Sequence, residues 1–150
     1  MQVKTSTDYA LRCVLYLSIH QRVATAIEIG KEMHISVNYT RVILQRLKAA
    51  GLVSSVQGVT GGYKLFKDPK DITIFDVFAV EEGSMTIYPS VFKKKMTGND
   101  MRSRCFSNVR YFYYEYQELS DNYLKKTTIA DILNSPEKLN AVQTSETLEK

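Results

Sequence analysis

The chain has 150 residues, of which 44% are hydrophobic, and a formal net charge of +4. That length fits one domain, or one small domain with an extension, and the apolar fraction allows a buried core, which excludes a disordered chain. Residues 1–67 contain nine Lys and Arg against three Asp and Glu, whereas residues 68–150 contain eleven against thirteen. The basic first part indicates either a polyanionic partner or a solvated surface.

The cysteines and the apolar runs bear on the compartment of the protein. Cys13 and Cys105 lie in neither a disulfide framework nor a zinc-binding spacing, which is typical of a reducing cytosol. No apolar run is long enough to span a membrane, and residues 1–12 lack the layout of a signal peptide. We therefore expect a soluble, cytoplasmic protein with no membrane partner.

A first helix is predicted to begin at Ser6 or Thr7, because a hydroxyl oxygen there can accept a hydrogen bond from the first turn. Asp8 is favourable beside the positive end of the helix dipole. The helix has apolar residues at i, i+3, i+4 and i+7, which are Ala10, Cys13, Val14 and Leu17. This spacing predicts one buried stripe.

Two further helices follow closely. The second is predicted to begin at Thr25, with Glu28 completing a capping box, and to end near Met33. Ser36 is the predicted cap of the third helix, and Gly51 ends it because glycine readily adopts the left-handed conformation. Two short helices joined by a tight turn predict a helix-turn-helix motif.

The third helix has two different faces. Its predicted inner face is Ile43, Leu44 and Leu47, and its outer face is Asn38, Arg41, Gln45 and Lys48. Amide and guanidinium groups can read base edges, and cationic groups bind phosphates. The outer face therefore predicts either DNA recognition or the solvated surface of an ordinary three-helix core.

A β-hairpin is predicted next, with strands at Val53–Gln57 and Tyr63–Phe66 around the loop 58–62. A helix-turn-helix followed by a hairpin is the winged-helix layout. Gly61 and Gly62 would let the loop backbone approach a phosphate chain, or they provide only the positive φ angles of a turn.

The second half is predicted to contain a linker helix, a loop and a long helix. An extended piece from Asp71 leads into the linker helix, which ends at Gly83, and the aperiodic, basic residues 84–104 predict a mobile loop. The long helix runs from about Ser107 to Lys126. Its regular stripe consists of Val109, Tyr113, Tyr116, Ser120 and Tyr123, and it is flanked by Phe112 and Leu119.

Such a stripe on so long a helix favours packing against another helix, although tyrosines could also contact a ligand. The chain offers no matching helix, so the predicted partner is the same helix of a second copy. The fold class is thus mainly α-helical with a small β-hairpin. It comprises a winged helix-turn-helix domain with its linker helix (1–83), a sensor-type loop (84–104), a dimerisation helix with a closing segment (105–133) and a frayed polar tail (134–150).

Nothing in the sequence predicts an enzyme or a metal site, since no activated nucleophile, paired carboxylates or metal-ligand spacing is found. We therefore expect no catalytic residues. Cys105 follows Arg102 and Arg104 near a helix start, a setting that favours thiol oxidation. It is a candidate thiol switch, or else a packed and inert cysteine.

Four segments resemble the Rrf2 family of bacterial transcriptional regulators, over about the first 133 residues. They are DYALR (8–12), ISVNYTRVILQRLKAAGLVSSVQG (35–58), GGYKL (61–65) and TTIADIL (127–133). The resemblance implies a homodimeric winged-helix regulator that binds operator DNA, with the third helix in the major groove and the wing at the adjacent minor groove. The partners it implies are double-stranded DNA, a second copy of the chain, and a regulatory protein or small-molecule effector.

The resemblance also assigns DNA-binding residues. The groove-facing residues are Ser36, Asn38, Tyr39, Arg41 and Gln45, and the wing residues are Gln57, Gly58, Thr60, Gly61, Gly62 and Lys64. Gln57 stands where the family often has arginine, which removes a cation attracted to a narrow minor groove, and Lys64 partly compensates. Thr40 replaces the usual leucine, so one core contact is expected to be smaller.

Many members that resemble this chain bind an iron-sulfur cluster through three cysteines in the loop before the dimer helix. Here that loop holds Cys105 alone, and although Asp8 matches a fourth-ligand position, no cluster or other cofactor is expected. The function expected is that of a sequence-specific homodimeric regulator of a palindromic operator, a repressor that responds to a metabolic or redox signal. The alternative is a winged-helix protein-interaction module that has lost specific DNA binding.

Overall fold

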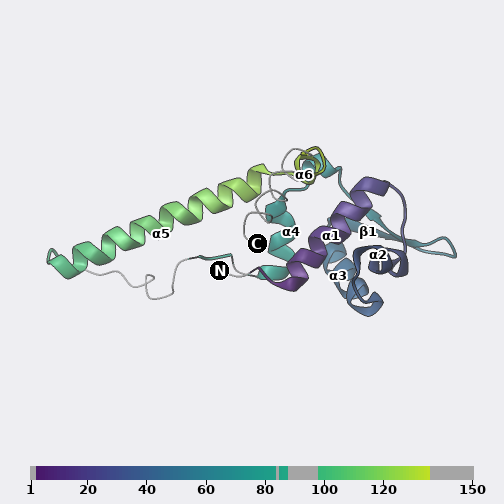
Figure 1. The fold of residues 1–150 in the computed structure, drawn as a ribbon, viewed down its shortest axis with the longest axis horizontal. Helices are drawn as coiled ribbons and strands as arrows, with labels where there is room; N and C mark the ends of the chain where they lie inside the picture. The colour runs from purple at the N-terminus through teal and green to yellow at the C-terminus, as the bar shows by residue number, and fades with distance from the viewer. Residues whose placement is uncertain (1–2, 84, 88–97, 136–150) are drawn as a thin grey trace, which may run out of the picture.

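The computed structural model describes residues 3–83, 85–87 and 98–135. It shows a helical head from which one long helix projects (Figure 1). The elements in chain order are α1 (Thr5–His20), α2 (Ala26–Met33), α3 (Val37–Ala49), β1 (Val53–Val56), β2 (Gly62–Leu65), η1 (Pro69–Asp71), α4 (Ile74–Glu82), α5 (Met101–Lys126) and α6 (Ile129–Leu133). The predicted fold class, mainly α with one antiparallel hairpin, is confirmed.

The core of the head combines residues from the first four helices and from α6. The predicted stripe of α1 and the predicted inner face of α3 are both buried. Cys13 is among the fully buried residues, and desolvation raises the pKa of its thiol to about 12. Ile129 of α6 is also fully buried in this core, so the end of the described chain closes the same head that its beginning forms.

The start of α1 differs from the prediction. The helix begins at Thr5 with Lys4 as its cap residue, and no side chain caps it. The Thr7 hydroxyl donates instead to the carboxylate of Glu82, at the end of α4. The prediction of a Ser6 or Thr7 cap is wrong because a tertiary partner engages Thr7, which is fully buried.

Thr25 caps α2, as predicted. The backbone N–H of Glu28 donates to the Thr25 hydroxyl oxygen at 3.1 Å. The Glu28 carboxylate also accepts hydrogen bonds from Tyr16, at 2.7 Å, and from Arg22. The carboxylate therefore ties α2 to the end of α1.

Helices α2 and α3 approach each other closely at Gly30 and Thr40. A Cβ atom on Gly30 would lie 2.8 Å from the carbonyl oxygen of Ile35 and 2.9 Å from the hydroxyl oxygen of Thr40. Thr40 is fully buried, and its hydroxyl donates to the Ser36 carbonyl oxygen at 2.9 Å. The small side chain at position 40 thus suits this crossing, where hydroxyl and backbone atoms already fill the space.

Helix α3 ends as predicted, since Ala50 caps it and Gly51 has a φ of 72°. In the hairpin, Val53 pairs with Leu65 and Val56 with Gly62. The loop is therefore residues 57–61, one position earlier than predicted. The shift follows from the pairing of Gly62, which belongs to a strand rather than to the loop.

The linker helix α4 is capped by a full box between Thr73 and Asp76 and ends at Gly83, as predicted. Of the predicted loop, residues 84 and 88–97 lie outside the described part of the chain. Helix α5 starts at Met101, earlier than the predicted start near Ser107, because the Asp100 carboxylate accepts from the Ser103 N–H at 3.0 Å. Residues 101–104 are consequently helical. The predicted frayed tail lies outside the described residues from position 136 onward.

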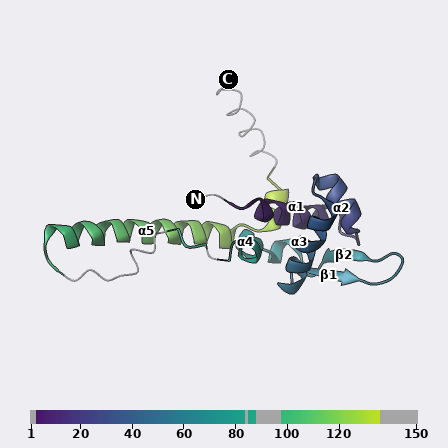
Figure 2. The ribbon, with the colours of Figure 1, turned by 90° about the horizontal axis from the view of Figure 1, so that it is seen from below.

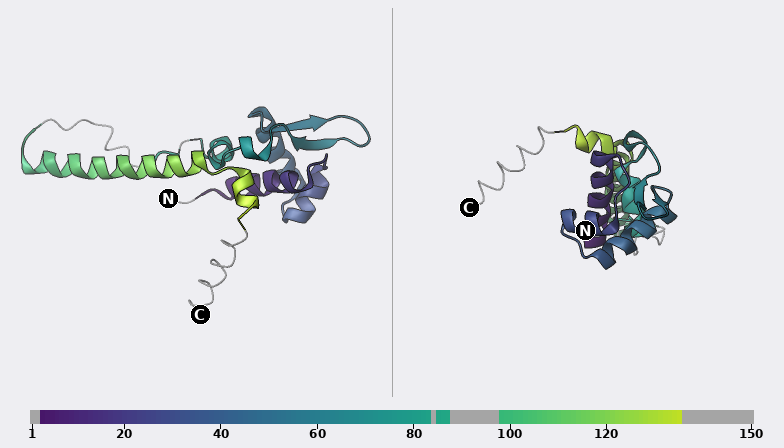
Figure 3. Two further views of the ribbon diagram at one scale, coloured as in Figure 1. Left: turned by 90° about the horizontal axis from the view of Figure 1, so that it is seen from above. Right: turned by 90° about the vertical axis from the view of Figure 1, so that its right-hand side faces the viewer.

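The long helix α5 returns toward the head at its carboxyl end (Figures 2 and 3). There the Ile74 N–H donates to the carbonyl oxygen of Thr127 at 2.9 Å, and the Ile129 N–H donates to the carbonyl oxygen of Ile72 at 2.9 Å. These bonds fasten the base of α5 to the beginning of α4. Across the described residues, none of the helices combines the length and the apolar character needed to cross a membrane.

Candidate nucleic-acid interface

Helix α3 presents the polar face that the sequence predicts. Its buried residues are Thr40, Ile43, Leu44 and Leu47. The four predicted outer residues, Asn38, Arg41, Gln45 and Lys48, are all exposed. The Arg41 guanidinium donates to the Asn38 amide oxygen at 3.3 Å, so these two groups form one hydrogen-bonding unit on the surface. Such a unit offers the donors and acceptors that base edges in a major groove require.

Two residues assigned to the groove-facing set also have structural roles. Ser36 caps α3, and its hydroxyl oxygen accepts from the Tyr39 N–H at 3.4 Å. The Tyr39 ring meets the ring of Tyr9 on α1 edge-on, with 5.7 Å between centroids. Both residues are nevertheless exposed, so each also adds to the polar surface around the start of α3.

The wing and α3 are joined on the same side of the head. The Lys48 ammonium donates to the Ser55 hydroxyl oxygen at 2.6 Å, which connects the last turn of α3 to strand β1. The strands then carry the loop 57–61 away from the helices (Figure 2). This bond therefore connects the recognition helix directly to the wing.

The tip of the wing is Gln57, Gly58, Val59 and Thr60, all exposed. Gly58 has a φ of 108°, which favours glycine. A Cβ on Gly61 would lie 2.4 Å from the Val56 carbonyl oxygen. Gly61 is thus required by the turn itself, and the tip that can approach a groove is formed by the residues before it.

The base of the wing is anchored by a pairing that the sequence did not indicate. The Ala24 N–H donates to the Tyr63 carbonyl oxygen at 2.9 Å, and the Tyr63 N–H donates to the Ala24 carbonyl oxygen at 2.8 Å. A Cβ on Gly62 would lie 2.4 Å from that Ala24 oxygen. Gly62 therefore allows the residues before α2 to pair with β2, which fixes the wing against the helix-turn-helix.

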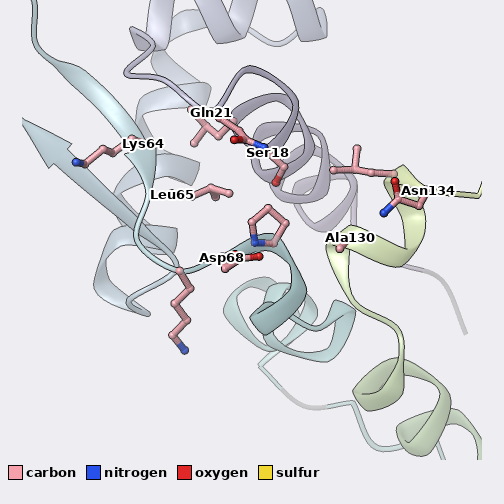
Figure 4. A pocket seen from close by; sticks show the side chains of 11 residues that line it. Ser18, Gln21, Lys64, Leu65, Asp68, Ala130 and Asn134 are labelled. Atoms are coloured by element: carbon pink, nitrogen blue, oxygen red, sulfur yellow. The ribbon is translucent and has the colours of Figure 1, made fainter.

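Successive residues of strand β2, Lys64 and Leu65, point their side chains in different directions. Leu65 points into a pocket of about 490 Å³ that is bounded by α1, β2, η1 and α6. Lys64 also lines this pocket, but its ammonium points away from it (Figure 4). This alternation is the ordinary two-residue period of a strand. Lys64 is thereby exposed on the wing, where it is expected to compensate in part for the cation missing at Gln57.

One cation of α3 was missed by the sequence analysis. Arg46 forms an ion pair with Glu81 of α4 at 2.7 Å, and the side chain of Glu81 is 1% exposed. The two residues are 35 positions apart, so no local spacing could reveal the pair. It places a basic group at the junction of α3 and α4.

The predicted dimerisation stripe is exposed along α5. Phe112, Leu119 and Tyr123 are 61%, 70% and 63% exposed, and Val109 and Tyr116 are also exposed, whereas Tyr113 is half-buried. The Phe112 and Tyr116 rings are stacked at 6.4 Å between centroids. A projecting helix with this much exposed apolar surface is typical of a protein–protein contact.

The cysteines lie in contrasting surroundings. Cys105 is exposed on α5, whereas Cys13 is buried in the head, and both are free. Asp8, which the resemblance matches to a fourth-ligand position, forms an ion pair with Arg12 at 2.6 Å. Within the described ranges, no three His, Cys, Asp or Glu residues come together as a metal site.

The chain is similar to known regulators in sequence and in fold. It is 26% identical to the HTH-type transcriptional regulator IscR of Serratia proteamaculans, over 93% of this chain and 83% of that protein. The structure of CymR, the global cysteine regulator of B. subtilis, has a TM-score of 0.71 and 22% identity, covering 88% of this chain and 95% of that one. That of T. potens IscR has a TM-score of 0.67 and 23% identity, covering 93% and 90%.

A family model described as Rrf2, iron-dependent transcriptional regulator, matches residues 3–135. The donor set of this chain does not fit an iron-sulfur cluster. Thiolates are the usual ligands of such clusters. Only two cysteines are present, and Cys13 lies in the apolar core, where burial holds its thiol protonated. The Asp8 carboxylate is paired with Arg12.

The family match spans every element from α1 to α6. The relatives named above are transcriptional regulators rather than enzymes. Because the family model covers most of the sequence, the chain belongs to the Rrf2 family of transcriptional regulators.

Proposed function

We propose that this chain is a homodimeric, sequence-specific DNA-binding regulator whose α3 enters a major groove while its wing contacts the adjacent minor groove. The observation that carries the proposal is the exposed polar face of α3, which a hydrogen bond between Lys48 and Ser55 connects to the wing. Asn38, Arg41 and Gln45 read bases in this arrangement, and Lys48 and Lys64 contact phosphates. Gln57 leaves the tip of the wing without a cation, so α3 supplies more of the affinity than the wing.

The second copy is held by the exposed stripe of α5. Two such helices pack against each other about a two-fold axis, which buries the apolar residues that each single chain exposes. The two recognition helices are then related by the same axis. A palindromic operator is the DNA sequence that matches this symmetry.

A regulator bound to its operator represses transcription in the simplest case. A metabolic or redox signal would then cause the regulator to release the DNA. The exposed Cys105 on α5 is the candidate thiol for a redox signal. Because its target is DNA, the regulator acts in the cytoplasm of its bacterial host.

The experiment that tests the proposal is selection of bound sequences from random DNA with the purified protein, reduced and oxidised. Enrichment of a palindrome, with an affinity that falls steeply as salt rises, supports a DNA-binding dimer. A difference between the two redox states supports the thiol switch.

A protein-interaction module is the second candidate, and the exposed aromatic residues of α5 favour it. In that case the selection would enrich no sequence in either state. Residual DNA binding would then be weak and independent of sequence, and the α3 surface would be an ordinary solvated face.

A further inference from the structure

The ion pair between Arg46 and Glu81 joins the recognition helix to the linker helix. The Arg46 Nη1 atom lies 2.7 Å from Oε2 of Glu81. The Glu81 side chain is 1% exposed, whereas that of Arg46 is 50% exposed. The second carboxylate oxygen of Glu81, Oε1, is buried without a hydrogen-bond partner among the described residues. Arg46 is therefore the principal compensation for a carboxylate that is otherwise removed from water.

The same end of α4 is held by the beginning of α1. The Lys4 ammonium donates to the Glu81 carbonyl oxygen at 2.8 Å and to that of Glu82 at 3.1 Å. The Lys4 backbone N–H donates to the Glu82 carboxylate at 3.0 Å, which also accepts from Thr7. The carboxyl end of α4 is thus a polar junction of three helices.

The other end of α4 is fastened to the base of α5. Ile74 bonds to Thr127, and the Lys125 ammonium lies 4.7 Å from the centre of the Phe75 ring. Helix α4 consequently connects α5 at one end with α3 at the other. The Arg46–Glu81 pair is the polar link on the α3 side.

We infer that Arg46 is a positioning residue, which sets the angle of α3 against α4 through Glu81 and does not act as a phosphate contact. This inference rests on the proposed DNA-binding function. Arg46 follows Gln45 by one residue, so its side chain leaves α3 about 100° away from that of a predicted base-reading residue. Its Nη1 group is committed to the Glu81 carboxylate, which holds the side chain toward α4.

The direction in which Glu81→Gln changes the affinity for DNA distinguishes a positioning role of the ion pair from a simple effect of charge. Glu81→Gln keeps the volume of the side chain and removes a negative charge. If charge alone mattered, DNA binding would become tighter, because the protein would repel the phosphates less. If the pair positions α3, binding becomes weaker, by about tenfold, because the helix loses its fixed orientation.

The experiment measures dissociation constants of the full-length protein for its selected operator, over a series of salt concentrations. Glu32→Gln is the matched control, because Glu32 is an exposed acid on α2 that loses the same charge. We expect Glu32→Gln to bind as well as the unmodified chain or slightly better, and Glu81→Gln to bind about tenfold more weakly.

The salt series provides the second readout. A lost phosphate contact lowers the slope of log K against log salt by about 0.9, whereas a lost positioning residue leaves the slope unchanged. We expect Arg46→Ala to weaken binding without changing the slope. Arg46→Lys recovers part of the affinity, and combining Arg46→Ala with Glu81→Gln costs less than the sum of the two single losses.

Circular dichroism and sedimentation show whether each variant is folded and dimeric. If Glu81→Gln does not fold, the slope measured for the half-exposed Arg46 decides the question. If folded Glu81→Gln binds the operator as tightly as the unmodified chain, or more tightly, the inference is wrong. It is also wrong if Arg46→Ala lowers the slope of log K against log salt by about 0.9. Neither result would contradict the proposed DNA-binding function. Failure of the unmodified protein to select any DNA overturns the proposed function, and the inference with it.

Discussion

Gly62 lies against the carbonyl oxygen of Ala24 so closely that a Cβ atom on the glycine would be 2.4 Å from it. This approach allows the two hydrogen bonds between Ala24 and Tyr63 that anchor the wing. The rigidity of the wing therefore depends on a glycine at its base.

Gly62→Ala is expected to separate the wing from the residues before α2, because neither partner of the contact is a flexible side chain. We expect a loss of about 2 kcal/mol or more in the free energy of unfolding, measured with urea, and weaker operator binding. Gly58→Ala is the control, since its Cβ would meet nothing within 4 Å and only the φ of 108° is strained. Gly58→Ala is expected to lower the free energy of unfolding by about 1 kcal/mol. Equal costs for the two substitutions would contradict the anchoring role of Gly62.

Arg41→Ala removes the guanidinium that lies beside Asn38 on the outer face of α3. If that face enters a major groove, the operator affinity falls by about 1–3 kcal/mol and the sequence preference relaxes at one position in each half-site. Competition between operator variants in a fluorescence anisotropy assay measures both effects. Lys31→Ala, at an exposed site on α2, is the control for loss of charge. An unchanged affinity for every DNA tested would argue against the recognition role of α3.

Leu119→Glu places a charge in the exposed stripe of α5. In a single chain this change costs little, because Leu119 is 70% exposed, but in a dimer the carboxylate would be buried. We expect sedimentation to show monomers whose thermal midpoint for the head is close to that of the unmodified head. Tyr114→Glu is the matched control, since Tyr114 lines the space between α4 and α5 of its own chain. If Leu119→Glu remains dimeric, the stripe is not the interface.

Glu28 should contribute to the dependence of stability on pH. Hydrogen bonds from Arg22 and then Tyr16 lower the pKa of its carboxyl from 4.5 to about 2 in the folded chain. Because the folded value is the lower one, this stabilisation is present above pH 4.5 and is lost as the pH falls toward about 2. The difference in unfolding free energy between the unmodified chain and Glu28→Gln should therefore shrink over that range. A difference that stays constant would show that the pKa is not lowered.

The two thiols should react at very different rates. Cys105 is exposed, whereas Cys13 is buried and has its pKa raised to about 12, so little thiolate forms there. Iodoacetamide is expected to label Cys105 alone in the native protein and both cysteines in denaturant, as counted by mass spectrometry. The labelled protein then tests the thiol switch, because an unchanged operator affinity would show that Cys105 does not control DNA binding.

Much of the fold follows from local chemistry and could be predicted. Thr25, Ser36 and Gly51 mark helix boundaries because their effects depend only on the next few residues of backbone. The buried stripes of α1 and α3 follow from helical period alone. For the same reason, the outer face of α3 was found without any knowledge of its surroundings.

The remaining features depend on residues that meet only after folding. Thr7 does not cap α1 because Glu82 engages its hydroxyl, and Arg46 is held toward α4 by Glu81. Both acids come from a helix far along the chain. The sequence predicts too late a start for α5, because its cap residue, Asp100, lies in a basic stretch without a hydrophobic period.

The hydrogen bonds between α4 and the segment after α5 determine where the chain returns to the head. The chain leaves the head after α4 and re-enters it beside the same helix, where Ile129 completes the core. The long arm is therefore an insertion within the head, which leaves at one end of α4 and returns at the other, and not an appendage added at one end. Changes in the length of the arm can be accommodated without altering the topology of the head, whereas removal of the last described residues would open its core.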